Sequence, residues 1–311
     1  MKIFFGILTL AILFSCSTAR KFQKTRSKNG NDLTFVYFKK GEASKDPYHQ
    51  ILGFRYPKEI DSMTAFYWGG QTEVTNKQYL KFVAYLKVSD SLGYEKHKPK
   101  TFNWRAYSED FDFADSMARN YDNLEAFGNH PVVNITPENA TAFVTWLNKI
   151  EPDSLVFYRL FKPFEWLELF NEKKEIDSSF AWEGNYWRNK NQLPLANYAE
   201  FDQDQIRYNH LTDRITFQNS DSVGYESYVN GPMNVWSYNP NYWGAWNMSG
   251  NVAEITESYY KLDSTWYCTT RGGSWHSPVF YLRKSSTETY KLPSPYVGFR
   301  VLKIQLKLRE D

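Results

Sequence analysis

Cysteine is scarce in this chain, since its 311 residues include only Cys16 and Cys268. Two cysteines cannot build a disulfide framework if Cys16 is engaged elsewhere. An excess of charge of one sign is also missing: the formal net charge is +2, which gives no indication of nucleic-acid binding. A long hydrophobic run is absent as well, because the apolar run at residues 3–14 is too short to span a bilayer stably.

Aromatic residues, by contrast, are abundant. They make up 18% of the chain, with 11 Trp and 23 Tyr. Rings that bury one face and keep a polar edge suit a loop-rich protein with little regular structure. The length suits one large domain or two small ones, and it provides for a sizeable buried core.

The N-terminus has the features of an export signal. Met1 and Lys2 give a positive start, the apolar run follows, and LFSC at residues 13–16 resembles the lipobox of bacterial lipoproteins. The resemblance implies that residues 1–15 are a signal peptide and that Cys16 is the lipidated N-terminus of the mature protein. The alternative is an ordinary signal peptide with an accidental cysteine.

Residues 16–31 are basic and poor in apolar side chains, a composition that predicts a flexible tether. Surface-export tags in bacteria that export many lipoproteins are acidic runs close behind the cysteine, whereas this segment is basic. We therefore expect an outer-membrane lipoprotein that faces the periplasm, with a single folded domain at residues 32–311.

Capping residues predict two helices. Thr75 can cap the first, with Gln78 completing a capping box, and Thr136 precedes Pro137 at the start of the second. A third, short helix is expected at residues 164–170. Alternating or β-branched segments predict short strands at residues 33–38, 63–68, 130–133, 267–275 and 297–301.

The central stretch, NPNYWGAWNMSGNVAEIT at residues 239–256, is typical of neither helix nor strand. Asn251 and Glu254 stand three apart across a turn, where their oxygens could join the carbonyls of Gly250 and Val252. Calcium takes 6–8 oxygen ligands of these kinds. The alternative is that Glu254 caps a turn while Asn251 adopts a left-handed backbone conformation.

Six motifs occur in a recognisable order: EVTNKQYLKF, HPVVNIT with TWLN, YRLFKPFEWLEL, the central stretch, RGGSW and VGFRV. From residue 63 to about residue 302 the chain resembles the formylglycine-generating enzyme, or sulfatase-modifying factor, domain family. The resemblance implies an α+β fold, a calcium-binding variant of the C-type lectin fold that is loop-rich with few helices and short strands.

The same resemblance implies calcium as cofactor. Asn251 and Glu254 would supply side chains to the ion, and Gly250 and Val252 would supply carbonyls. A second family site would start from Asn197, with Asp221 as the best later carboxylate.

The resemblance also locates the family's catalytic centre. Active relatives carry two cysteines, five residues apart, after the GGS-aromatic strand; the pair binds copper and oxidises a substrate cysteine with oxygen. Counted without gaps, those positions are Ser277 and Leu282 here, and neither side chain can bind Cu(I) as a thiolate does. Cys268 is expected to be a small buried hydrophobe, so the chain is predicted to be a pseudoenzyme with no catalytic residues.

Other chemistries have little support in the sequence. The five histidines show no HxxxH or HxxE spacing, and only His276 lies beside the vacated position. A Ser277–His276–Asp arrangement is disfavoured, because neighbouring residues of a strand point to opposite faces.

Three classes of function remain. The first is a non-catalytic, calcium-stabilised lipoprotein, a scaffold or binding subunit of an envelope complex, resembling lipoproteins of gliding motility and type IX secretion. The second is a peptide- or glycan-binding module that uses the former active-site cleft, and the third is an enzyme of altered chemistry. The expected partners are envelope proteins and the membrane, with no nucleic acid.

The candidate docking surfaces are a polar loop region at residues 89–128 and two aromatic loops at residues 182–187 and 238–246.

Overall fold

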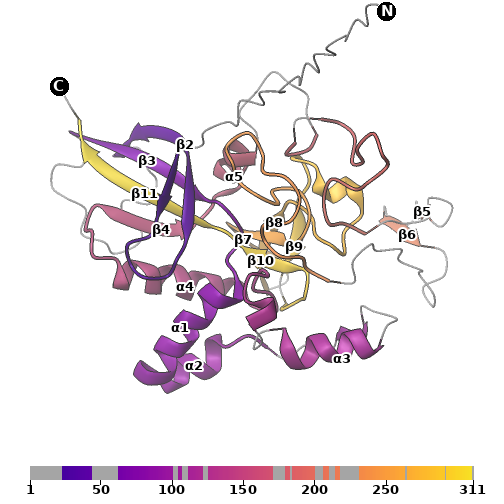
Figure 1. Cartoon of the computed structure of the whole chain (residues 1–311), viewed down its shortest axis with the longest axis horizontal. Coiled ribbons are helices and arrows are strands. Elements are labelled where there is room, and N and C mark those ends of the chain that lie inside the picture. The colour runs from indigo at the N-terminus through magenta and orange to yellow at the C-terminus, as the bar shows by residue number, and fades with distance from the viewer. Residues whose placement is uncertain are drawn as a thin grey trace, which may run out of the picture.

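The computed structural model is a mixed arrangement of helices and sheets with long connecting loops (Figure 1). It describes residues 23–43, 62–100, 104–106, 111–121, 125–170, 179–182, 184–199, 206–209, 214–217, 231–262, 265–290 and 292–309. The α+β class and the loop-rich character are confirmed. Cys16 and Asp221 lie outside the described residues. Within them, no helix combines the length and the apolar character that crossing a membrane requires.

The larger sheet is antiparallel and has the strand order β1-β2-β3-β11-β4. β3 alternates between buried and partly buried residues, as expected for a strand with one face on the core. β11, near the C-terminal end of the chain, pairs with both β3 and β4 and so connects β4 to the rest of the sheet. The bounds are β1 (Lys24–Arg26), β2 (Thr34–Glu42), β3 (Met63–Gly70), β4 (Val156–Leu160) and β11 (Val301–Leu308).

β1 corrects the predicted domain boundary. Lys24 pairs with Val36 and Arg26 with Thr34, so β1 is the edge strand of the larger sheet. The residues that follow it turn into β2, where Ser27 N donates to Leu33 O at 2.9 Å. A basic composition suggested a tether up to residue 31, but the chain joins the sheet at residue 24 because backbone pairing does not depend on apolar side chains.

Both predicted helix starts are confirmed. α1 (Asn76–Ser89) begins with the Thr75–Gln78 capping box, and α4 (Pro137–Ile150) begins with Thr136 as its cap. Asn139 completes a second capping box in α4, which the sequence analysis did not predict. The short third helix is α5 (Pro163–Phe170).

Residues 89–128 are not the loop region that their polarity suggested. They contain α2 (Ser91–His97), η3 (Trp104–Ala106), α3 (Phe111–Asn120) and η4 (Glu125–Phe127). α3 buries Ala114 and Met117 on one side, and Tyr121 follows at the same helical spacing. α2 buries none of its residues, which explains why its sequence has no amphipathic pattern.

A smaller sheet has the strand order β10-β7-β8-β9, with β10 parallel to β7. β7 begins inside the central stretch, so the last residues of that stretch are extended rather than irregular. The predicted strand at residues 130–133 is reduced to a single bridge between Thr75 and Pro131. The bounds are β7 (Ala253–Leu262), β8 (Thr265–Arg271), β9 (Glu288–Tyr290) and β10 (Val297–Phe299), with a separate hairpin of β5 (Ile206–Asn209) and β6 (Arg214–Phe217).

Aromatic rings fill the space between α1, α4 and β10. Tyr79 stacks on Phe143 with centroids 5.6 Å apart, and Phe299 meets both rings edge-on. Phe82 and Trp146 extend the cluster toward α2. The high aromatic content therefore belongs to a packed core as well as to loops.

Candidate functional site

The central stretch surrounds a buried arginine. Arg300, between β10 and β11, and Glu254, in β7, are both 1% exposed. Arg300 Nε lies 2.9 and 3.0 Å from the two Glu254 carboxylate oxygens, and its Nη2 lies 2.5 Å from Oε1. Trp166 Nε1 donates to Oε2 at 2.7 Å. Both oxygens of Glu254 are therefore bound to protein donors, and a guanidinium neutralises their charge.

The same guanidinium connects several segments. Nη1 donates to the carbonyl of Gly70 at the end of β3, at 2.9 Å, and Nη2 donates to the carbonyl of Trp246 at 2.7 Å. A buried charge is tolerated only when it is paired and its remaining donors are satisfied. Arg300 meets this requirement and holds the central stretch against both sheets.

Asn251 acts as a bridge in this cluster. Its φ angle is 68°, so the alternative prediction of a left-handed conformation for Asn251 is confirmed. Its Oδ1 accepts from Met233 N at 2.7 Å, and its Nδ2 donates to Glu73 Oε1 at 2.9 Å. The amide satisfies polar groups of two distant segments.

These contacts do not fit the calcium site that the sequence predicted from Gly250, Asn251, Val252 and Glu254. A calcium ion at Glu254 would lie beside the Arg300 guanidinium and would have to displace its hydrogen bonds. The Asn251 Oδ1 is also bound to a backbone N–H. Among the described residues, no group of three or more His, Cys, Asp or Glu could hold a metal. Glu254 is the partner of Arg300 in this structure, and calcium binding by Gly250, Asn251, Val252 and Glu254 stays a prediction.

Asn197, the start of the second predicted calcium site, packs against this same cluster. Its carbonyl accepts from Asn251 N at 2.9 Å, and its Nδ2 donates to Gly231 O at 3.0 Å. Asp221, its proposed partner, lies outside the described residues. The structure thus gives Asn197 a role in joining two turns.

Glu73 is a second carboxylate in the cluster, which the sequence analysis missed. It is fully buried, and burial raises the pKa of Glu73 to about 7, with the neighbouring charge of Glu254 adding to the rise and Arg300 opposing it. Its hydrogen-bond donors are the side-chain amides of Asn251 and Asn247. The Glu73 carboxyl is therefore expected to change its protonation state near neutral pH.

The two positions that the resemblance assigns to the catalytic cysteines are buried in the packed interior. Leu282, at the end of η6 (Val279–Leu282), is completely buried in an apolar cluster with Phe180, Ala196 and Tyr198. Ser277 is also buried, with its Oγ 2.8 Å from Ser274 Oγ and 3.3 Å from Glu288 Oε2. Neither side chain offers a soft metal ligand.

The thiol of Cys268 and the imidazole of His276 are both held in their neutral forms by burial. Cys268 is buried, as predicted, and burial raises the pKa of its thiol to about 12. His276 stacks on Tyr296 with centroids 5.3 Å apart, and burial lowers the pKa of His276 to about 4. A protonated thiol is a poor nucleophile and a poor metal ligand.

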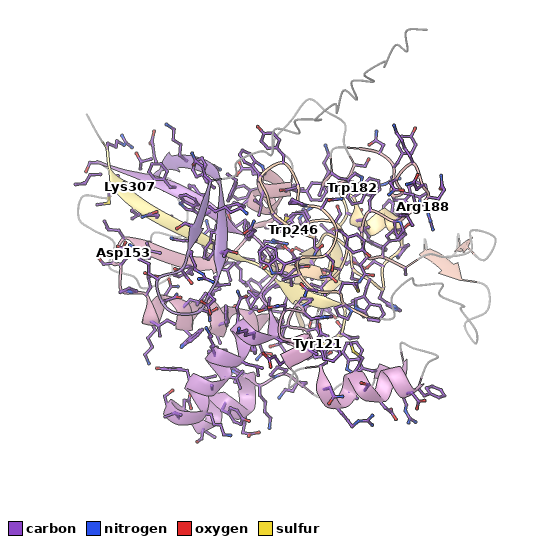
Figure 2. All side chains as sticks on the ribbon, in the orientation of Figure 1. Tyr121, Asp153, Trp182, Arg188, Trp246 and Lys307 are labelled. Carbon is purple, nitrogen blue, oxygen red and sulfur yellow. The ribbon has the colours of Figure 1, made fainter. Side chains whose placement is uncertain are left out.

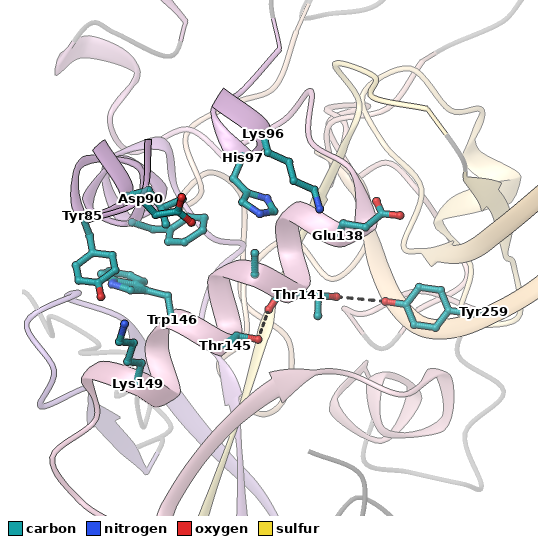
Figure 3. Close-up of a pocket in the computed structure, with 13 residues that line it drawn as sticks. Tyr85, Asp90, Lys96, His97, Glu138, Thr141, Thr145, Trp146, Lys149 and Tyr259 are labelled. Atoms are coloured by element: carbon teal, nitrogen blue, oxygen red, sulfur yellow. Dashed lines mark hydrogen bonds between the residues drawn. The ribbon is translucent and has the colours of Figure 1, made fainter. Parts of the chain in front are cut away.

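A groove of about 530 Å³ lies between α1, α2 and α4, with Tyr259 of β7 at one end (Figure 3). Its floor is apolar and includes Phe82, Leu86 and Trp146. Charged side chains of both signs surround this floor: Asp90, Lys96, Glu138 and Lys149. Apolar grooves with a polar rim are typical binding surfaces.

Hydrogen bonds shape the walls of this groove. Asn139 Nδ2 lies 2.9 Å from His97 Nδ1, and burial lowers the pKa of His97, so the neutral imidazole accepts the amide hydrogen. Thr141 Oγ1 lies 3.4 Å from the Tyr259 hydroxyl, the contact drawn in Figure 3. The Asn139 capping box was the one sequence signal that could have drawn attention to this region.

Comparisons with known proteins agree with this fold. The family model described as "Sulfatase-modifying factor enzyme 1-like domain" matches residues 24–304. A search of curated proteins gave no match. The chain is similar to the structure of CarF, with 19% identity over 76% of this chain and 86% of CarF and a TM-score of 0.50.

Two further solved structures are similar over almost their whole length. Variable protein 1 of Treponema denticola is 17% identical over 90% of this chain and 98% of its own, with a TM-score of 0.50. PvdO from Pseudomonas aeruginosa is 15% identical over 92% and 99%, with a TM-score of 0.52. At such identities these likenesses show the fold alone.

Proposed function

Because this chain belongs to the sulfatase-modifying factor enzyme 1-like domain family, we propose that it is a non-catalytic lipoprotein that binds a partner in an envelope complex. The observation that carries this proposal is the state of the vacated site. Leu282 is built into an apolar cluster, Ser277 is buried, and the thiol of Cys268 is buried and protonated. The family's copper chemistry needs two accessible thiolates at one point.

The membrane and envelope parts of the proposal rest on the sequence. The lipobox at residues 13–16 supports lipidation of Cys16, and the basic segment behind it supports an outer-membrane anchor that faces the periplasm. The order of the six motifs supports a C-type-lectin-like variant of the fold and a likeness to the lipoproteins of gliding motility and type IX secretion. Arg300 supplies a cation at Glu254, and calcium stabilisation stays an expectation from the resemblance.

The groove beside α4 is the proposed docking surface. Asp90, Lys96 and His97, from residues predicted to form a specialised surface, line one wall. The apolar floor and the mixed charges fit an amphipathic segment of a partner protein, with a basic residue placed against Asp90 or Glu138. A buried aromatic floor with a charged rim is where binding energy concentrates in interfaces.

The test is capture of a partner from native membranes under mild detergent. Thr145 is exposed on α4 and lines the groove, so Thr145→Arg blocks it with little effect on folding. Val88→Arg is the matched control, since Val88 is 91% exposed on α1 and does not line the groove. We expect a stoichiometric partner with the wild type and the control, and loss of that partner with Thr145→Arg.

Two results would contradict the proposal. A partner that is retained by Thr145→Arg would exclude the groove as its docking surface. Copper-dependent oxidation of a sulfatase-type cysteine peptide by the purified protein would exclude a non-catalytic role.

A further inference from the structure

Two loops form one face beside the vacated site. The described residues of the first loop are 179–182 and 184–199, and the second loop comprises residues 277–284. Lys284 N donates to Ser179 O at 3.0 Å, and Ala199 N donates to Ser277 O at 3.0 Å, so backbone hydrogen bonds connect the loops at two points. The apolar cluster around Phe180 and Leu282 lies beneath them. The two loops therefore pack on a buried apolar cluster.

Large apolar side chains on this face are turned to solvent. Tyr186 is 78% exposed, Leu193 57% and Phe280 56%. Trp182 and Trp187 are partly buried and pack against the cluster around Phe180 and Leu282. An exposed patch of this kind on a supported face indicates a binding surface.

Basic residues lie in the same two loops as these apolar groups. The two loops contain Arg188, Lys190, Arg283 and Lys284, and the single acidic residue of their sequences, Glu183, is outside the described residues. The guanidinium of Arg283 lies over the Phe280 ring, 5.7 Å from its centroid. Aromatic and apolar side chains among Lys and Arg match the interface of an anionic bilayer, where rings enter the headgroup region and cations meet phosphates.

The length of chain before β1 is a second, independent observation. Eight residue steps separate Cys16 from Lys24, the first residue of β1. Even fully extended, they span about 26–29 Å. A folded chain of this size has a radius of gyration of about 19 Å. If Cys16 carries the lipid, the distance between the folded domain and the membrane surface cannot exceed a fraction of the width of the domain.

We propose that the face formed by residues 179–182, 184–199 and 277–284, the basic aromatic face, lies against an anionic lipid bilayer. This proposal rests on the lipidation of Cys16 in the proposed function and adds the orientation of the domain. Figure 2 shows Trp182 and Arg188 at the upper right of the molecule, whereas α1 and α2 lie at its lower edge in Figure 1. In this orientation the groove beside α4 stays free for a partner.

The experiment places a single fluorescent probe on the lipidated, full-length protein bound to vesicles. Tyr186→Cys puts the probe on the basic aromatic face, and Leu92→Cys puts it on α2, at an equally exposed site. Cys268 is buried and protonated and Cys16 is acylated, so the introduced thiol is the one that reacts. The vesicles contain phosphatidylcholine and phosphatidylglycerol with a quencher attached to the lipid.

We expect the probe at residue 186 to be quenched several-fold more than the probe at residue 92. Lys190→Glu should reduce that difference, and Lys87→Glu, an exposed change on α1, should leave it unchanged. Equal quenching at the two sites, with the protein still floating with the vesicles, would overturn the proposed face while leaving lipidation intact. A protein that does not float with the vesicles would instead overturn the lipid anchor.

Discussion

Arg300 is the positive centre of the cluster around Glu254. Both side chains are buried, and five hydrogen bonds connect the guanidinium to Glu254 and to two backbone carbonyls, besides the bond from Trp166 to Glu254. The sequence contained both residues in recognisable motifs, but they lie 46 positions apart. Spacing along the chain cannot reveal such a pair, whereas the left-handed turn at Asn251 is local and could be anticipated.

Removal of Arg300 should therefore be costly. Arg300→Met leaves Glu254 as an unpaired buried carboxylate, and we expect a loss of about 3–5 kcal/mol in the free energy of unfolding, measured with urea. Arg309→Met is the control, because its pair with Glu42 is half-exposed, and it should cost less than about 1 kcal/mol. A chelator should leave the melting temperature of the wild type unchanged. A clear fall in that temperature would indicate that calcium binds in this cluster.

Glu73 predicts a pH dependence of stability. Its folded pKa is about 7, above the usual 4.5, so the native state holds a proton that the unfolded state releases. The stabilisation is complete below about pH 4.5 and is lost as the pH rises to 7. The loss over this window is on the order of 3 kcal/mol.

Glu73→Gln should remove this loss of stability with rising pH. The amide has nearly the shape of the protonated acid and does not titrate, so the variant should unfold at higher urea than the wild type at pH 8. Glu168→Gln, on the surface, should follow the wild type. Parallel curves for wild type and Glu73→Gln between pH 5 and pH 8 would show that Glu73 has an ordinary pKa.

At the scale of elements, the starts of α1 and α4 were predictable because capping is encoded within four residues. The helices in residues 89–128 were not predicted, for two different reasons. α2 has no buried stripe, and the stripe of α3 consists of Ala114 and Met117 with Tyr121 beyond its end. α2 instead starts at a local cap, where Asp90 Oδ1 accepts from Gly93 N at 2.9 Å, whereas α3 depends on the packing of its short stripe.

The capping box of α4 gives a prediction at this scale. Thr136→Ala removes the acceptor for Asn139 N, which lies 3.2 Å from the hydroxyl. We expect a loss of about 1 kcal/mol in the free energy of unfolding. Thr145→Ala, an exposed change in the middle of the same helix, should be nearly neutral. Equal effects of the two changes would mean that the cap contributes nothing specific.

At the scale of the molecule, the sequence predicted one domain with a long tether, and the structure shortens that tether. The position of β1 depends on its pairing with β2. The composition of residues 16–31 does not indicate this pairing. The folded region that the family model matches likewise begins at residue 24. A short connection changes the expected behaviour of an anchored protein, since it keeps the basic aromatic face within reach of lipid.

The lipid anchor itself gives the last prediction. A single acyl chain holds a protein only marginally, whereas two or three hold it firmly. Cys16→Ser should therefore shift the mature protein from the membrane to the soluble fraction, provided that an alternative signal peptide directs its export. The basic aromatic face alone adds only about 1 kcal/mol per Lys or Arg at an anionic surface, so the released protein should bind vesicles weakly and lose that binding in high salt. Salt-resistant membrane attachment of Cys16→Ser, or an unmodified Cys16 in the intact mass of the wild type, would contradict the anchor.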